Sequence, residues 1–220
     1  MPLALIGLAL AWAVMLLFGA MEFDRGLLLF FYAGESADFV AVARWLTELG
    51  GGGVLLAATG FGAGMLLYRR DWRGALLLAA ITLSGRLLVE LQKGWSARLR
   101  PDPQGHLVPV ETFAFPSGHA ANATLVWLCL ALLVPRGDRT RALAVWAAVW
   151  LALAVGASRV MLGVHWPSDV IGGWAFGLFW ALALLRLSGH RFDEGTAAPP
   201  PHFSLPKESE DGRPHPSRRP

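Results

Sequence analysis

Long apolar blocks separated by short polar segments dominate this chain. Several blocks fall a little short of the ~20 residues that cross a bilayer, but flanking glycine, threonine and tryptophan residues extend them. We therefore predict an all-α polytopic membrane protein with a six-helix transmembrane bundle. The predicted spans are Leu3–Ala20, Val54–Tyr68, Ala75–Leu91, Ala120–Val134, Ala142–Ala157 and Val170–Leu187.

Two of these spans need a further argument. The block at Val54–Tyr68 spans only if Gly50–Gly53 joins it. The first block has the length of a signal peptide, but no basic residues precede it. We expect it to be retained as a span, because signal peptides begin with a positively charged region.

The segment between the first two spans has a different pattern. Apolar residues recur there at helical spacing, with polar residues between them, which predicts a short amphipathic helix lying at the membrane interface. The apolar positions are Phe39, Val42, Ala43, Leu46 and Leu49, and the polar ones are Arg44, Thr47 and Glu48.

Composition agrees with membrane embedding. Hydrophobic residues make up 55% of the chain and charged residues 16%, whereas soluble domains carry about 25% charged residues. The net charge is +3, but the basic residues are scattered over loops and a tail, which argues against nucleic-acid binding. Cys129 lies inside an apolar block and has no partner cysteine. We predict a membrane domain over residues 1–188 and a disordered, proline-rich cytoplasmic tail over 189–220.

Three short motifs place charged residues at the edges of the apolar blocks. They read KGWSARLRP at Lys93–Pro101, PSGH at Pro116–His119 and SRVMLGVHWPSD at Ser158–Asp169. Charge near a bilayer is costly and is rarely kept without a use. Three cations can hold a group of about two negative charges, and two histidines can supply a nucleophile and a proton donor. The cations are Lys93, Arg100 and Arg159, and the histidines are His119 and His165.

Predicted helix boundaries strengthen this interpretation. Ser117 and Gly118 precede a helix that begins near His119, and a helix N-terminus attracts phosphate. Gly118 lets the backbone approach an oxyanion closely. Pro167 suits the first turn of the last span and leaves His165 just outside the helix. Asp169 can then reach back to the imidazole and fix its tautomer.

Arginine placement predicts the topology. Arg69–Arg73 and Arg136–Arg141 are the basic loops, and basic loops stay in the cytoplasm. Both termini are then cytoplasmic, and the three motifs face the periplasm or exterior of the inner (plasma) membrane. Lys93, Arg100 and Arg159 depart from the rule there, which their use as phosphate ligands explains. Arg98 also departs from it, and we interpret it as an interfacial anchor.

The three motifs resemble the signatures of the type 2 phosphatidic acid phosphatase (PAP2) superfamily. They read as K-x6-RP, PSGH and SR-x5-H-x3-D at the family spacing. The resemblance implies that His165 attacks phosphorus to form a phosphohistidine, that His119 protonates the leaving group and then activates water, and that Asp169 orients His165. It further implies that the charged oxygens are stabilised by Lys93, Arg100, Arg159, Ser117 and the Gly118 amide. We expect no metal and no other cofactor, because cations hold the substrate and no carboxylate cluster is evident.

The motifs leave several questions open. They do not separate a hydrolase from a lipid phosphotransferase, in which an alcohol replaces water. A transporter is disfavoured, because the charges cluster at span ends instead of mid-span. The substrate is a lipid phosphate; undecaprenyl diphosphate, phosphatidylglycerol phosphate, phosphatidate and lipid A phosphates all qualify. Asp102 stands where related sequences often carry a basic residue, which weakens the expectation of a second phosphate site.

Other residues near the motifs allow two interpretations each. Glu90 lies one helical turn before Lys93 and either pairs with it or faces solvent. Trp166 either lines the pocket or serves only in packing. His106 is expected to be solvated. The pattern assigns no oligomeric state.

Overall fold

The computed structural model describes residues 2–189, and every extended regular element within them is a helix. In chain order the elements are α1 (Pro2–Phe18), α2 (Glu22–Phe31), α3 (Ala37–Glu48), α4 (Gly52–Tyr68), α5 (Trp72–Ser96), a short 3-10 turn η1 (Pro103–Gly105), α6 (Gly118–Leu133), α7 (Asp138–Met161) and α8 (Pro167–Leu187). The predicted all-α class is confirmed. The predicted tail lies, apart from Gly189, outside the described residues.

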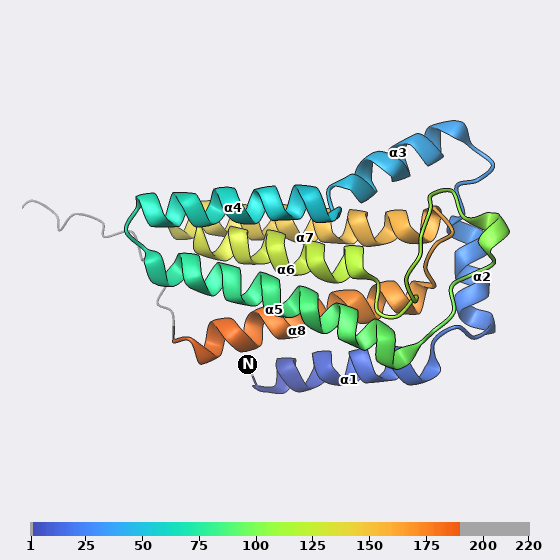
Figure 1. Cartoon of the computed structure of the whole chain (residues 1–220), viewed down its shortest axis with the longest axis horizontal. Helices are drawn as coiled ribbons and strands as arrows, with labels where there is room; N and C mark the ends of the chain where they lie inside the picture. Colours follow the sequence, from blue (N-terminus) through green and yellow to red (C-terminus); the bar gives the residue numbers. More distant parts are fainter. Residues whose placement is uncertain (1, 190–220) are drawn as a thin grey trace, which may run out of the picture.

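Six apolar helices lie side by side in one bundle, namely α1 and α4–α8 (Figure 1). Helix α6 is the central one, and most of its residues are buried against its neighbours. Close packing between α6 and α8 depends on glycine. A Cβ at Gly173 would lie 2.7 Å from the Ser117 carbonyl oxygen, and one at Gly177 would lie 2.7 Å from that of Ala121. Small residues allow such close approach of helices in membrane proteins.

The six helices coincide with the six predicted apolar blocks. Within the described residues, α5, α7 and α8 are each long and apolar enough to cross a membrane. Two bent pairs, α1 with α2 and α3 with α4, raise the number of candidate spans to five, and α6 is a shorter apolar helix. The chain is a polytopic helical membrane protein, while the count of six crossings stays a prediction. Helix α4 begins at Gly52, so two of the glycines do join the second block.

The connection between α1 and α4 holds two helices, so the prediction of one amphipathic helix there was incomplete. Helix α3 matches the predicted segment, whereas α2 was missed. The chain bends by 98° between α1 and α2, and the bend rests on Asp24. Its buried carboxylate accepts hydrogen bonds from the Ala20 and Ser168 amides at 2.5 and 2.9 Å and from the Ser168 hydroxyl at 2.5 Å.

Helix α5 carries the first motif to the end of the bundle. The Asp71 carboxylate caps its N-terminus by accepting from the Gly74 amide at 2.8 Å. Its last turn contains Lys93, and it stops at Ala97, whose φ of 45° is left-handed. The first motif therefore begins on a helix and continues in a loop. All three motifs lie at the end of the bundle where α2 and α3 are found, opposite the α4–α5 and α6–α7 loops (Figure 1).

Candidate active site

A cavity of 330 Å³ lies where the three motifs meet. It is formed by the last turn of α5, the N-terminus of α6, the C-terminal turn of α7 and the loops beside them. It brings together six of the eight residues expected at the site. Its lining is Thr47, Glu48, Lys93, Arg100, Val108, Pro109, Val110, Glu111, Thr112, Gly118, His119, Arg159 and His165.

The imidazole of His165 has a defined tautomer. Its Nε2 atom lies 3.1 Å from Arg100 Nη1, and its Nδ1 atom lies 3.4 Å from Asp169 Oδ2. A guanidinium group only donates hydrogen bonds, so Nε2 accepts from Arg100. The single proton of the neutral ring is then on Nδ1, facing the carboxylate, and the Nε2 lone pair is directed to the cationic side of the site.

Electrostatics favour the neutral form of this ring. His165 is only 1% exposed. Burial lowers its pKa well below the ordinary value of 6.5, and the positive charges of Arg100, Arg159 and Lys93 lower it further. A neutral imidazole has the lone pair that a nucleophile needs.

Asp169 is fully buried, and both of its carboxylate oxygens are used. Oδ2 faces His165 and also accepts from the Trp166 amide at 2.9 Å. The contact with the Trp166 amide caps the N-terminus of α8. Oδ1 accepts from Arg98 Nη1 at 2.9 Å. Helix α8 begins at Pro167, as predicted. His165 therefore lies just before the helix, and Asp169 in its first turn faces the imidazole.

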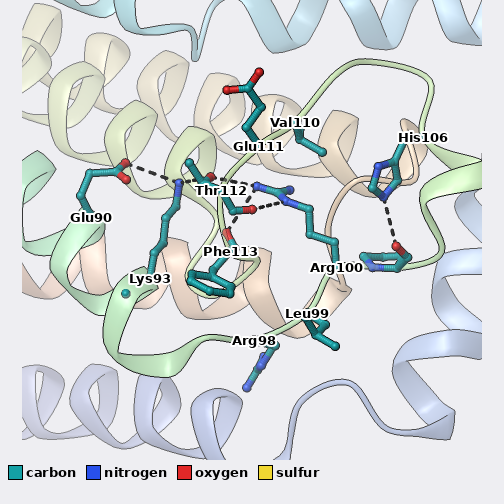
Figure 2. Close-up of a pocket in the computed structure, with 12 residues that line it drawn as sticks. Glu90, Lys93, Arg98, Leu99, Arg100, His106, Val110, Glu111, Thr112 and Phe113 are labelled. Atoms are coloured by element: carbon teal, nitrogen blue, oxygen red, sulfur yellow. Dashed lines mark hydrogen bonds and ion pairs between the residues drawn. The ribbon is translucent and has the colours of Figure 1, made fainter.

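The interpretation of Arg98 as an interfacial anchor is wrong. Its side chain is almost entirely buried and makes an ion pair with Asp169. Figure 2 shows it pointing away from Lys93 and Arg100, toward α1. There its Nη2 atom donates to the carbonyls of Met15 and Leu16 at 2.8 and 2.6 Å. Its guanidinium also lies 4.4 Å from the centre of the Phe115 ring.

Lys93 and Arg100 converge on Thr112, a residue that the sequence did not single out. Lys93 Nζ lies 3.1 Å from Thr112 Oγ1 and 3.4 Å from Glu90 Oε1, so Glu90 does pair with Lys93. Arg100 donates to the Thr112 carbonyl at 2.6 Å and to the Val164 carbonyl at 2.5 Å. Figure 2 shows both cations directed to the threonine from opposite sides. Burial lowers the pKa of Arg100, and the negative charge of Asp169 partly offsets this.

Arg159 reaches the cavity from the last turn of α7. It is 4% exposed, and its Nη1 atom donates to Thr47 Oγ1 at 2.7 Å. Its Nε atom and the Ser117 hydroxyl oxygen are buried and have no hydrogen-bond partner among the described residues. Buried polar atoms are normally paired, and an oxyanion would be a suitable partner for both.

The N-terminus of α6 completes the site. A Cβ at Gly118 would lie 3.2 Å from Lys93 Nζ, so a glycine there leaves room for the ammonium group beside the helix N-terminus. His119 follows and lines the cavity together with His165. The helix end and Lys93 together make this corner favourable for an anion.

Neighbouring residues support the walls of the site. Trp166 donates from Nε1 to the Leu99 carbonyl at 3.0 Å and packs against a buried cluster, which is a packing role. His106 is half-buried, and its Nε2 atom lies 3.1 Å from the Pro101 carbonyl oxygen. It lines a second cavity of 690 Å³ that shares Lys93, Arg100 and Thr112 with the first.

Within residues 2–189, no three histidine, cysteine, aspartate or glutamate side chains are grouped as ligands for a metal ion. The polar groups around the cavity are three cations, two histidines, two threonines and the carboxylates of Glu48 and Glu111, so positive charge exceeds negative charge there. Such a set suits a phosphate group better than a metal ion, because phosphate oxygens accept hydrogen bonds from arginine and lysine.

The fold defines an integral membrane protein with a candidate oxyanion site at one end of a helical bundle. The sequence model of the PAP2 superfamily matches residues 73–193, which contain all three motifs. The chain belongs to this superfamily, as its motifs predicted.

Individual relatives agree with this assignment. The chain is 38% identical over 146 residues to phosphatidylglycerophosphatase B of Bacillus subtilis, covering 61% of this chain and 71% of that protein. It is 35% identical over 159 residues to lipid A 1-phosphatase of Rhizobium etli, covering 68% and 64%. It is also similar to the crystal structure of a transmembrane PAP2-type phosphatidylglycerolphosphate phosphatase from Bacillus subtilis. That similarity has a TM-score of 0.77 and 30% identity, and it covers 86% of this chain and 98% of the other.

Proposed function

We propose that the protein is a membrane phosphatase that hydrolyses lipid phosphate or diphosphate monoesters through a phosphohistidine. The observation that carries this proposal is the arrangement around His165. Its Nε2 lone pair is directed to Arg100, its Nδ1 proton is directed to Asp169, and Lys93 and Arg159 line the same cavity. Family membership and the relatives named above support the same class of reaction.

In the first step, His165 Nε2 attacks phosphorus and the bond from phosphorus to the leaving oxygen breaks. His119, in its protonated form, gives that oxygen its proton, and the negative charge of the bound phosphate favours this form. In the second step, His119 takes a proton from water as the water oxygen attacks phosphorus, and the bond from phosphorus to Nε2 breaks. Free phosphate and neutral His165 result.

Arg100 has a double use in this scheme. Its donors are directed to His165, Thr112 and three backbone carbonyls. When phosphate binds, the contact from Nη1 to Nε2 gives way to one with a phosphate oxygen, which releases the lone pair for attack. Lys93, Arg159, Ser117 and the Gly118 amide stabilise the remaining charge.

The proposal also covers metal independence and sidedness. Three cations replace the divalent ion that many phosphoryl-transfer enzymes use. The two basic loops lie at the end of the bundle opposite the motifs (Figure 1). With those loops in the cytoplasm, the site faces the periplasm or exterior of the inner membrane, and both termini are cytoplasmic.

Phosphate release by detergent-purified protein tests the proposal. The panel contains phosphatidylglycerol phosphate, phosphatidate, undecaprenyl diphosphate and a lipid A phosphate, with His165→Ala as the control. We expect release from at least one lipid by the wild type and none by the variant. An added alcohol that ends up phosphorylated in place of free phosphate would identify a phosphotransferase. Absence of release from every lipid would contradict the proposal.

A further inference from the structure

We propose that Arg98 is a positioning residue that acts on the nucleophile through Asp169. The inference rests on the proposed function and adds a residue to its machinery. Arg98 does not line the cavity that holds Lys93, Arg100 and Arg159, but it does line the adjoining cavity of 690 Å³. Its contact is with the carboxylate behind His165.

The two oxygens of Asp169 have separate partners. Arg98 Nη1 donates to Oδ1 at 2.9 Å, while Oδ2 faces His165 Nδ1 at 3.4 Å and accepts from the Trp166 amide at 2.9 Å. A carboxylate that rotated about its Cβ–Cγ bond would lose the ion pair with Arg98. The guanidinium therefore helps to fix the plane of the carboxylate, and with it the orientation of the imidazole that Oδ2 faces.

Arg98 is itself fixed by the first helix. Its Nη2 atom donates to the carbonyls of Met15 and Leu16, which belong to the last turn of α1 and have no partner within an ideal helix. Its Cζ atom lies over the Phe115 ring, 4.4 Å from the ring centre. A lysine ammonium is a single point donor and cannot reproduce this two-ended, planar contact.

The charge balance makes Arg98 hard to replace. Ser168 Oγ joins two carboxylates in one network, because it donates to Asp24 at 2.5 Å and lies 3.3 Å from Arg98 Nη1. The charged groups facing Asp169 are thus Arg98 from the loop after α5, Asp24 from α2 and, when protonated, His165. Without Arg98, two buried carboxylates share this network with no permanent cation in contact, and an uncompensated buried charge is strongly unfavourable.

Steady-state kinetics of Arg98→Gln and Arg98→Lys give the first test. The matched control is Arg25→Gln, which removes an exposed arginine next to Asp24. In metal sites, loss of an outer partner that orients a histidine typically costs about 10- to 100-fold, and we take the same range for this histidine. We expect a loss of this size in kcat for the glutamine variant with KM within about threefold of wild type, because the phosphate ligands are untouched. The lysine variant should recover part of the loss. An unchanged kcat, or a loss confined to KM, would overturn the proposal.

A double-mutant cycle gives the second test. If Arg98 acts only through Asp169, then Arg98→Gln should reduce kcat by no more than about twofold in an Asp169→Asn background. Multiplicative losses from the two changes would overturn the proposal. If Arg98→Gln fails to fold, as judged by gel filtration and thermal unfolding, the same double-mutant cycle is measured with Arg98→Lys in its place. A wild-type protein without phosphatase activity would instead contradict the proposed function, so the two failures are distinguishable.

Discussion

Arg159 Nη1 donates a hydrogen bond to Thr47 Oγ1 at 2.7 Å, although the two residues are 112 positions apart in the chain. The contact ties the last turn of α7 to α3, the helix predicted to lie at the membrane interface. It directs the guanidinium into the cavity, and the buried Nε atom of Arg159 has no partner in the described part of the chain. The interfacial helix is thus part of the wall that holds the proposed phosphate ligand.

Replacing Thr47 by valine should weaken catalysis. Valine keeps the shape but accepts no hydrogen bond, so one donor of a buried guanidinium is left unpaired. An unpaired buried donor costs about 1–3 kcal/mol, and we expect kcat/KM to fall about tenfold, equivalent to about 1.4 kcal/mol. The control is Thr59→Val, since the Thr59 hydroxyl donates within its own helix to the Leu55 carbonyl at 2.8 Å. Equal activity of the two variants would contradict this role of Thr47.

The two histidines should respond differently to the leaving group. His165→Ala should abolish hydrolysis of both alkyl and p-nitrophenyl phosphates, because it removes the attacking atom. His119→Ala should slow alkyl phosphate hydrolysis by about 10²–10⁴-fold and p-nitrophenyl phosphate hydrolysis much less, because p-nitrophenolate leaves without protonation. Initial rates with both substrates provide the measurement. The same loss for both substrates in His119→Ala would argue against its role as the acid.

The lowered pKa of His165 should be visible in a titration. Because burial and then the three cations disfavour the charged ring, we expect its ¹⁵N signals to report a neutral imidazole at pH 6.0, about half a unit below the ordinary value. The assignment comes from the signals lost in His165→Gln.

The same shift has a consequence for stability. The unfolded chain takes up this proton near pH 6.5 and the folded chain resists it, so this contribution to stability is present above about pH 6.5 and is lost as the pH falls below it. Thermal unfolding of wild type and His165→Gln at pH 7.5 and 5.0 measures the difference. Half-protonation of His165 at or above pH 6.5 would contradict the burial argument.

Activity should survive EDTA, and orthovanadate should inhibit by occupying the phosphate site. Arg159→Lys keeps the positive charge but loses the paired N–H donors of the guanidinium, so we expect a slower reaction. Loss of one hydrogen bond to a transition-state oxygen costs about 3 kcal/mol, or roughly a hundredfold in rate. Arg136→Lys, on the opposite loop, is the control and should be unaffected. If EDTA abolished activity and Mg²⁺ restored it, a mechanism that relies on lysine and arginine side chains without a metal ion would be ruled out.

Sidedness can be measured by labelling single cysteines in a Cys129→Ser background. Gln104→Cys lies on the exposed turn η1 near the motifs, and Arg139→Cys lies at the opposite end of the bundle. An impermeant maleimide should modify the first in spheroplasts and the second only after permeabilisation. The reverse pattern would invert the proposed topology.

The sequence was sufficient for the elements with a strong, local signal. The apolar runs of α1 and α4–α8 are long enough to be recognised without tertiary information, and the three motifs sit at their ends. Helix α2 lacks such a signal, because it has only ten residues. Its contact with the start of α8 is made through Asp24 and Ser168. That contact cannot be deduced from residues so far apart.

Within the site, the sequence predicted which residues take part better than it predicted where their side chains point. Lys93, Arg100, Arg159 and both histidines line one cavity, as their common motifs suggested. Arg98 was assigned to the interface because it is a basic residue beside a predicted span. The structure ends α5 at the left-handed Ala97, and beyond that residue helical spacing no longer predicts where a side chain points. Thr47 and Thr112 were not identified as site residues, because a threonine that holds a cation in place has no characteristic spacing.

The contact between Asp24 and Ser168 spans 144 residues, and it constrains the order in which the molecule can mature. During synthesis the bent pair of α1 and α2 is made first, while Ser168, at the start of α8, is added 144 residues after Asp24. The turn that carries Asp169 cannot be completed until both ends of the membrane domain have met, and contacts so distant in sequence form slowly. If His165 and Asp169 act as proposed, a truncated chain that ends before α8 should release no phosphate, although it already contains Lys93, His119 and Arg159.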